Sequence, residues 1–313
     1  METAGEYSSF NLLMHNTWLG LCKGVPGLPD DLRRHSYEVN WIEYKFRNSQ
    51  NEYVHPEQVI SSTSQSHTLL MEWKEGENVS EDQAKRYLHV QADDLIQNAF
   101  LPPSACKSYD VVYIGLSNNG PRLLKGLQGC GAGFPLLLRE SDGFRLAANE
   151  FAIQPLNMTF APLLKLDFDL VPRVLLPFDH DSPPWLVASY VIPKIVEYMC
   201  KRETRVLLTR TASDVIPACW NSLSSDYQNQ LKRKVHGVIK EASQYEFSDY
   251  LSLNKAARAV THTVTWDITR NPMSLSMNKR TSDFKRLQRL QAELIEALRT
   301  GKRQPQTAKI DFN

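Results

Sequence analysis

The sequence contains few cysteines, and none of them forms a recognisable binding motif. Among 313 residues there are five cysteines, widely scattered and without any Cys-x-x-Cys pair. This odd number and wide spacing argue against a disulfide scaffold and against a structural zinc site. We therefore expect a reducing compartment and a cytoplasmic location.

Long apolar runs and a signal sequence are also missing. No stretch of about 18 apolar residues occurs, so we expect no membrane span and no membrane partner. The first residues include Glu2 and Glu6 instead of a basic segment, so we expect no secretory signal. Because the Gly-x-x-x-x-Gly-Lys-Ser/Thr phosphate loop is absent, any ATP-driven step would require an ATPase partner.

The composition excludes a disordered chain and favours two domains. Hydrophobic residues make up 42% and charged residues 23% of the chain, enough apolar surface for a buried core in each domain. Between residues 39 and 116, three strand-like runs are followed by a helical pattern and a further strand, which predicts a mixed α/β core. After about Phe178 helical patterns dominate. We therefore expect domains over 1–178 and 179–280, then an amphipathic helix and tail over 281–313.

The formal net charge of +1 conceals an uneven distribution of charge. Residues 1–225 contain 20 Lys and Arg against 26 Asp and Glu, whereas residues 226–303 contain 15 against 8. An acidic part joined to a basic part is a pattern found in nucleic-acid-binding proteins. The alternative is that the basic part is an ordinary solvated helix surface.

A group of acidic and basic side chains lies on neighbouring strand-like runs. Glu72 and Lys74 project from the same face of a strand because alternate residues share a face. Glu57 begins an earlier strand-like run, fifteen residues before Glu72. If the two runs pair as a hairpin, Glu57 and Glu72 converge at one end of the sheet. Two such carboxylates are typical ligands of Mg²⁺, whose bound water Lys74 would help to orient.

The helix that follows adds two more polar side chains. Gln83 and Tyr87 are four residues apart and therefore share a helix face that leans toward the same pocket. The alternative for Gln83 is a capping box with Ser80, and the alternative for Tyr87 is simple packing. The predicted site consists of Glu57, Glu72, Lys74, Gln83 and Tyr87.

This series of motifs resembles the PD-(D/E)XK nuclease superfamily, and its RecB-like branch in particular. Pro-Glu is followed by Glu-x-Lys and then by Gln-x-x-x-Tyr in the next helix, all within residues 55–87. The resemblance implies a restriction-endonuclease-like mixed sheet flanked by helices, Mg²⁺ or Mn²⁺ as cofactor, and hydrolysis of DNA. In such enzymes the carboxylates bind the metal, the lysine assists the water, and the Gln/Tyr helix contacts the substrate or braces the site.

The sequence differs from the family pattern in the first motif and upstream of it. Glu57 occupies the position where the family usually has Asp, and no upstream helical motif is clear. Glu38 or Glu43 is a candidate additional acid, and His15 or His55 a candidate additional metal ligand. The sequence alone does not choose among them.

The basic part has the order of elements of a winged helix. Helical patterns over 185–201, 213–222 and 226–243 precede a strand-like run over 261–268, and Ala256–Arg258 would lie near the wing. Thr211 or Ser213 would cap the middle helix, and Thr281 or Ser282 the final one. The basic helix carries the predicted DNA-binding residues Lys232, Arg233, Lys234 and Lys240. The alternative is a helical subdomain with a basic solvated face.

Taken together, these patterns predict a metal-dependent DNA endonuclease with a basic DNA-binding domain. Restriction, transposition, repair and phage defence are all compatible settings. The alternative is a non-catalytic DNA-binding or assembly subunit that keeps a nuclease-like scaffold, in association with an ATPase or another protein.

Overall fold

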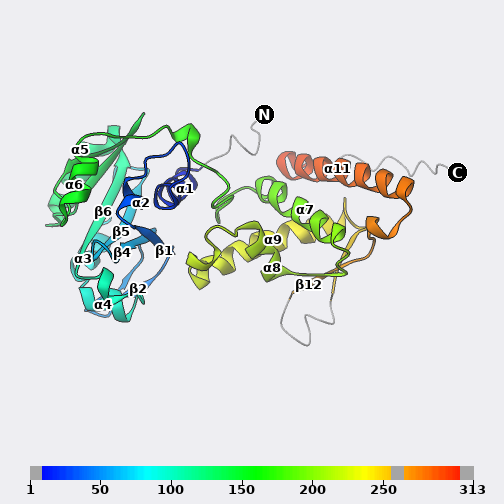
Figure 1. The fold of residues 1–313 in the computed structure, drawn as a ribbon, viewed down its shortest axis with the longest axis horizontal. Coiled ribbons are helices and arrows are strands. Elements are labelled where there is room, and N and C mark those ends of the chain that lie inside the picture. Colours follow the sequence, from blue (N-terminus) through cyan, green and yellow to red (C-terminus); the bar gives the residue numbers. More distant parts are fainter. Residues whose placement is uncertain (1–8, 255–263, 304–313) are drawn as a thin grey trace. The chain divides into compact units, whose positions relative to one another are not determined.

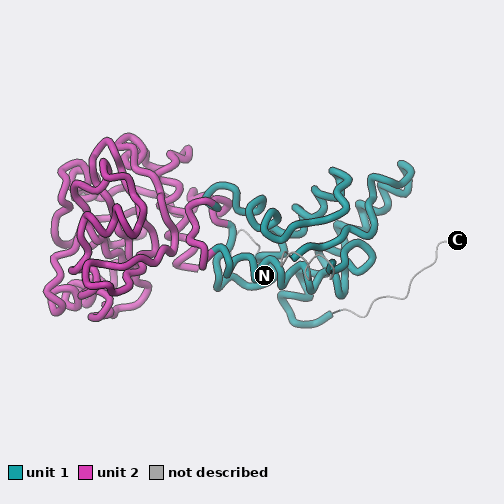
Figure 2. The backbone as a smooth tube through the Cα atoms, turned by 90° about the horizontal axis from the view of Figure 1, so that it is seen from below, with its two compact units in different colours: residues 1–7, 177–220, 228–313 teal, residues 8–176, 221–227 magenta. Residues whose placement is uncertain are grey.

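The computed structural model describes residues 9–254 and 264–303, and the chain divides into two compact units (Figure 2). The first unit, drawn in magenta and labelled unit 2 in Figure 2, consists of residues 9–176 together with 221–227. The second unit, drawn in teal and labelled unit 1, consists of residues 177–220 together with 228–254 and 264–303. The part of the chain expected near the wing, Ala256–Arg258, lies outside the described residues.

A seven-stranded mixed sheet forms the centre of the first unit (Figure 1). Its order is β1-β4-β5-β6-β7-β8-β9. The central pairs β5–β6 and β6–β7 are parallel, and the pairs on either side of them are antiparallel. The strands are β1 (Glu38–Ile42), β4 (Gln58–Ser62), β5 (His67–Lys74), β6 (Ser108–Leu116), β7 (Leu136–Glu140), β8 (Gly143–Ala148) and β9 (Leu164–Lys165). The expected mixed α/β core is therefore confirmed.

Helices cover both faces of this sheet, which explains why β5 is apolar on two sides. Leu69, Met71 and Trp73 belong to one core cluster, with residues of α1, α2 and α6. Leu70, between them, belongs to a second cluster with residues of α3, α4 and α5. Alternate side chains of a strand point to opposite faces, so Glu72 lies on the face of the second cluster. The helices are α1 (Phe10–Lys23), α2 (Asp31–Arg34), α3 (Glu81–Leu88), α4 (Ala92–Gln97), α5 (Gly120–Gly129) and α6 (Gln154–Phe160).

Two expected elements of the first unit are interrupted. The alternating residues 39–47 predict one strand, but β1 ends before Glu43, which has a φ of 54°, and pairing resumes in β2 (Phe46–Arg47). β2 pairs with the short strand β3 (Tyr53–Val54), and residues 55–57 separate β3 from β4. The helical pattern that begins at Ser80 predicts one helix to about Phe100, but the structure has two helices here, because Gln91 and Asp94 form a capping box that starts α4.

The second unit combines helices with a three-stranded antiparallel sheet of order β10-β12-β11 (Figure 1). Its elements are α7 (Pro184–Cys200), β10 (Arg205–Leu207), α8 (Leu208–Val215), α9 (Ser225–Gln244), β11 (Leu251–Leu253), β12 (Thr265–Ile268) and α11 (Met277–Thr300). Up to β12 this is the order of a winged helix. Short 3₁₀ turns complete both units: η1 (Pro103–Ala105), η2 (Ser117–Asn119), η3 (Phe168–Leu170), η4 (Trp220–Ser222) and η5 (Pro272–Ser274).

Two expected helix starts in the second unit are wrong. Thr211 and Ser213 lie inside α8, where their hydroxyls donate to backbone carbonyls one turn earlier instead of capping the helix. The final helix begins after Ser276, before Thr281, and ends at Gly301, which has a φ of 67°. No helix in the described part of the chain is long and apolar enough to cross a lipid bilayer.

Candidate metal centre

The pairing of β4 with β5 brings the two predicted carboxylates to one end of the sheet. Gln58 is paired with Met71, and the backbone N–H of Glu57 donates to the carbonyl of Met71 over 3.0 Å. This is the hairpin that the strand patterns indicate. Glu57 therefore reaches the end of the hairpin at which Glu72 lies.

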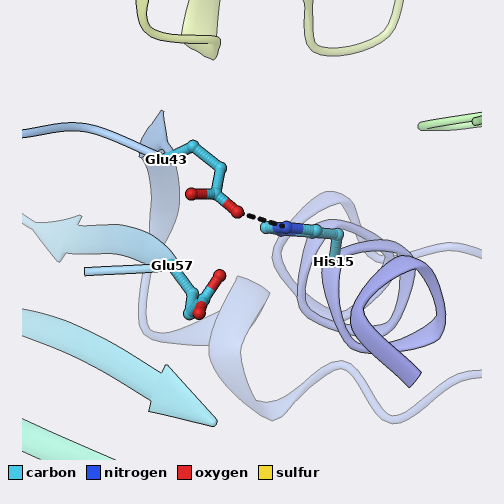
Figure 3. Close-up of side chains that lie close together, drawn as sticks. All are labelled: His15, Glu43 and Glu57. Carbon is cyan, nitrogen blue, oxygen red and sulfur yellow. Dashed lines mark ion pairs between the residues drawn. The ribbon is translucent and has the colours of Figure 1, made fainter. Parts of the chain in front are cut away.

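Glu57 is grouped with a histidine and a second glutamate from two other elements. His15 of α1, Glu43 at the end of β1, and Glu57 each offer a ligand atom, and these atoms lie within 4.8 Å of one another. Figure 3 shows the His15 ring opposite the Glu43 carboxylate, with Nε2 3.7 Å from Oε1. His15 and Glu43 are two of the four residues between which the sequence did not choose. Of the other two, Glu38 is exposed at the opposite end of β1.

His55 contacts this cluster from its exposed side. Its Nε2 lies 3.2 Å from Oε2 of Glu43, and about half of its side chain is exposed. His55 therefore pairs with one ligand of the cluster without belonging to the group itself.

Backbone contacts hold the cluster together. The N–H of Glu43 donates to the carbonyl of Glu57 over 2.9 Å, so the left-handed conformation of Glu43 is fixed by the strand that carries the other carboxylate. The side-chain amide of Gln58 donates to the carbonyl of His15 over 3.3 Å. Strained backbone of this kind persists where the surrounding structure enforces it, commonly at functional sites.

The imidazole of His15 is buried without a hydrogen-bond partner. His15 is 0% exposed, and its ring packs edge-on against Trp73 at 4.7 Å. Among residues 9–254 and 264–303, neither of its ring nitrogens makes a hydrogen bond. An unsatisfied buried polar group is costly, whereas a cation held between this nitrogen and two carboxylates would satisfy it. The cluster therefore fits a divalent metal ion.

The two carboxylates of the cluster have opposite pKa shifts. Burial, together with the negative charges of Glu43 and Glu72, raises the pKa of Glu57 well above its usual value. Burial acts in the same direction on Glu43, but His15, Glu57 and His55 stabilise its carboxylate and lower its pKa to about 2. In the metal-free protein the raised pKa of Glu57 favours its protonated form at a higher pH than for an ordinary glutamate. A divalent cation that binds there displaces this proton.

Glu72, Lys74, Gln83 and Tyr87 form a continuous hydrogen-bond network. The ammonium group of Lys74 donates to Oε1 of Glu72 over 2.6 Å and to Oε1 of Gln83 over 3.1 Å. The hydroxyl of Tyr87 donates to Oε2 of Glu72 over 3.1 Å. Burial raises the pKa of Glu72, which is 1% exposed, while Lys74 and Tyr87 favour its charged form. Four of the five predicted residues are therefore linked by direct hydrogen bonds.

Gln83 and Tyr87 of α3 each combine a local role in the helix with a contact in the candidate site. Ser80 does cap α3, because its hydroxyl accepts from the backbone N–H of Gln83. The side chain of Gln83, however, accepts a hydrogen bond from Lys74. Tyr87 is buried in the second core cluster and also bonded to Glu72, so packing and site contact coincide in one side chain.

The predicted DNA-binding lysines and arginine do not share one environment on α9. Arg233 and Lys240 are exposed, whereas Lys232 and Lys234 are half-buried. The ammonium group of Lys234 donates to the carbonyl of Ser182 over 2.9 Å. This contact gives Lys234 a structural role within the second unit.

Comparison with known protein families gives a match to part of the chain. A family model described as the MJECL32 domain matches residues 12–126, which is less than half of the chain. The matched segment includes every residue of the cluster and of the Glu72 network. No curated protein and no solved structure matches the chain.

Proposed function

We propose that this protein is a divalent-metal-dependent nuclease of the PD-(D/E)XK type that hydrolyses phosphodiester bonds in DNA. One observation carries the proposal. A candidate metal site of one imidazole and two carboxylates lies at the same sheet end as the buried Glu72–Lys74 pair. The charge of Glu72 contributes to the raised pKa of Glu57, which supports an arrangement in which the two groups act together.

The chemistry of the side chains defines the metal that they would hold. Carboxylate oxygens suit Mg²⁺ and Mn²⁺, and an imidazole ligand is better suited to Mn²⁺ than to Mg²⁺. His15, Glu43 and Glu57 would hold the ion. Glu72 is a further proposed ligand, because carboxylate oxygens that accept from Lys74 and Tyr87 retain lone pairs. When bound, the ion would polarise a phosphate oxygen and lower the pKa of a water.

The remaining side chains act on the water and on the phosphate. Lys74 keeps its ammonium group at the sheet end, where it orients a water and offsets the negative charge that develops on the phosphate. Two contacts come from α3: Gln83 accepts a hydrogen bond from Lys74, and Tyr87 donates one to Glu72. These contacts make α3 a positioning element for both charged groups.

The full chain is therefore expected to cleave DNA in the presence of Mn²⁺ and, more slowly, of Mg²⁺. Supercoiled plasmid and end-labelled single-stranded and duplex oligonucleotides would be incubated with each metal, and with EDTA as the control. Nicking or shortening that requires the metal supports the proposal. Binding of Mn²⁺ and of DNA without hydrolysis of any of these substrates would instead establish the alternative, a non-catalytic DNA-binding subunit.

A second candidate role, duplex DNA binding by α9, is supported by the exposure of Arg233 and Lys240. In a winged helix the corresponding helix enters the major groove. Replacing Arg233 by Ala should weaken duplex binding and reduce the slope of log affinity against log salt by about 1. Lys201→Ala is the matched control, because Lys201 is exposed at the end of α7 and paired with Glu197. An unchanged salt slope for Arg233→Ala, measured by fluorescence anisotropy, would remove α9 from the interface.

A further inference from the structure

The β2–β3 hairpin connects two residues of the candidate metal centre. Residues 44–56 leave the sheet directly after Glu43 and return directly before Glu57. His55, near the returning end, lies 3.2 Å from the Glu43 carboxylate. Whatever binds along this hairpin therefore lies beside the metal centre.

Aromatic and basic side chains share the exposed surface of the hairpin. Tyr53 is 44% exposed even though two cations approach its ring. Lys45 Nζ lies 4.3 Å and Arg47 Cζ 4.2 Å from the ring centroid. Arg47 is held in place by bonds to the Asn51 carbonyl, over 2.7 Å, and to the Tyr53 hydroxyl, over 3.0 Å. The result is a preorganised group of one phenol ring and two cations.

A strained aromatic residue lies on the turn that supports this hairpin. Phe100 is 70% exposed and has a φ of 55°, in the left-handed region that a bulky side chain rarely occupies. Neither its burial nor its backbone conformation explains a phenylalanine at this position. Asn or Gly would adopt the same φ with less strain and would expose less apolar surface. Exposed, strained residues of this kind persist where function requires the side chain.

Hydrogen bonds connect the turn to the base of the hairpin. Trp41 Nε1 donates to the carbonyl of Ala99 over 2.7 Å, and the side-chain amide of Asn98 donates to the carbonyl of Arg47 over 2.8 Å. The Tyr44 hydroxyl donates to the carbonyl of Asn98 over 3.3 Å, and the rings of Trp41 and Tyr44 stack at 4.5 Å. The turn that carries Phe100 is thus held directly against the base of the hairpin.

We propose that the hairpin 44–56 and the turn 98–100 bind unpaired nucleotides of the nucleic acid that is cut at the candidate metal centre. Exposed aromatic rings next to cations are the features that hold a single strand, whose bases stack on rings while its phosphates contact Lys and Arg. Bases within an intact duplex are already stacked and do not offer their faces. The occupant is therefore a single-stranded segment that flanks the cleaved phosphate, and this inference rests on the proposed function.

Oligonucleotide binding by the full chain tests this inference without requiring cleavage. Fluorescence anisotropy with a labelled single strand and the matching duplex would be measured in EDTA for the wild type, Tyr53→Ala and Phe100→Asn. Each substitution is expected to weaken single-strand binding about tenfold, since stacking on one aromatic ring commonly contributes that much or more. The melting temperature of Phe100→Asn should equal or exceed that of the wild type. Met158→Gln, which removes an exposed apolar side chain from α6, is the matched control.

The outcomes separate this inference from the proposed nuclease activity. If both variants bind the single strand as tightly as the wild type, the surface serves another partner, such as a protein, and the inference is wrong even if the wild type cuts DNA. Equal weakening of duplex and single-strand binding would also overturn it, because unpaired bases would not be what the surface recognises. Selective loss of single-strand binding supports it, and remains measurable if the wild type shows no hydrolysis.

Discussion

Replacing Lys74 by Met is expected to reduce phosphodiester hydrolysis about 10³-fold, because loss of one preorganised charge at the reacting phosphate commonly has an effect of this size. Methionine keeps most of the length of the side chain but removes the ammonium group that bonds Glu72 and Gln83. DNA affinity should stay close to that of the wild type, since Lys74 is mostly buried. The measurement is the single-turnover cleavage rate at saturating Mn²⁺, together with anisotropy for binding.

Lys85→Met is the matched control for this substitution. Lys85 is an exposed lysine of α3 that pairs only on the surface with Glu81, so its loss should change neither the rate nor the affinity. Hydrolysis by Lys74→Met at the wild-type rate would show that the Glu72–Lys74 pair is not part of the reacting site. A thermal unfolding profile similar to that of the wild type would show that a loss of rate does not reflect unfolding.

Replacing Glu57 by Gln is expected to abolish stabilisation of the protein by Mn²⁺. A metal that binds the folded state at about 100 times its Kd stabilises it by about 2.7 kcal/mol. In a unit of this size such a gain raises the melting temperature by about 5–10 °C. Glutamine preserves the shape of Glu57 but cannot offer the charge that the cation requires. Scanning calorimetry with and without Mn²⁺ measures the rise in melting temperature of the wild type and of the variant. Glu38→Gln removes an exposed carboxylate of β1 and should behave as the wild type.

A full metal-induced shift in Glu57→Gln would contradict the assignment of Glu57 as a ligand. If Mn²⁺ does not change the melting temperature of the wild type, the cluster is excluded as a metal site altogether. These two results are distinct, because the first concerns one residue and the second the whole cluster.

The same variant should have the opposite effect on stability when no metal is present. The pKa of Glu57 is raised in the folded protein, so its contribution to stability is present below the ordinary pKa of glutamate and is lost as pH rises through the raised value. The pKa of Glu43 is lowered, so its contribution is present above the ordinary value and is lost only as pH falls toward 2. At about pH 8 in EDTA, Glu57→Gln should therefore melt at a higher temperature than the wild type, and the difference should shrink in acid. A wild type that is the more stable of the two at that pH would show that the pKa of Glu57 is not raised in the folded protein.

Local sequence signals were sufficient for elements whose ends depend on nearby residues. The helical pattern over 10–22 predicts an end near Gly24, and Gly24 caps α1 in the left-handed conformation. Two strand-like runs around Ser141 and Asp142 predict a hairpin, and these residues form the turn between β7 and β8. The strand β5 was likewise recognisable from its run of apolar residues. In contrast, the break at Glu43 depends on a hydrogen bond to Glu57, a residue that is distant in sequence. No local propensity of Glu43 indicates that break.

The residues of the candidate site were likewise predictable from the sequence only in part. The sequence by itself predicted Glu57, Glu72, Lys74, Gln83 and Tyr87 as one site, because one hairpin and the next helix carry all five residues at regular spacings. Only the tertiary structure selected His15 and Glu43 from the open candidates. Their approach to Glu57 depends on the packing of α1 against the sheet and on the pairing of β1 with β4, and such long-range contacts leave no periodic pattern in the chain.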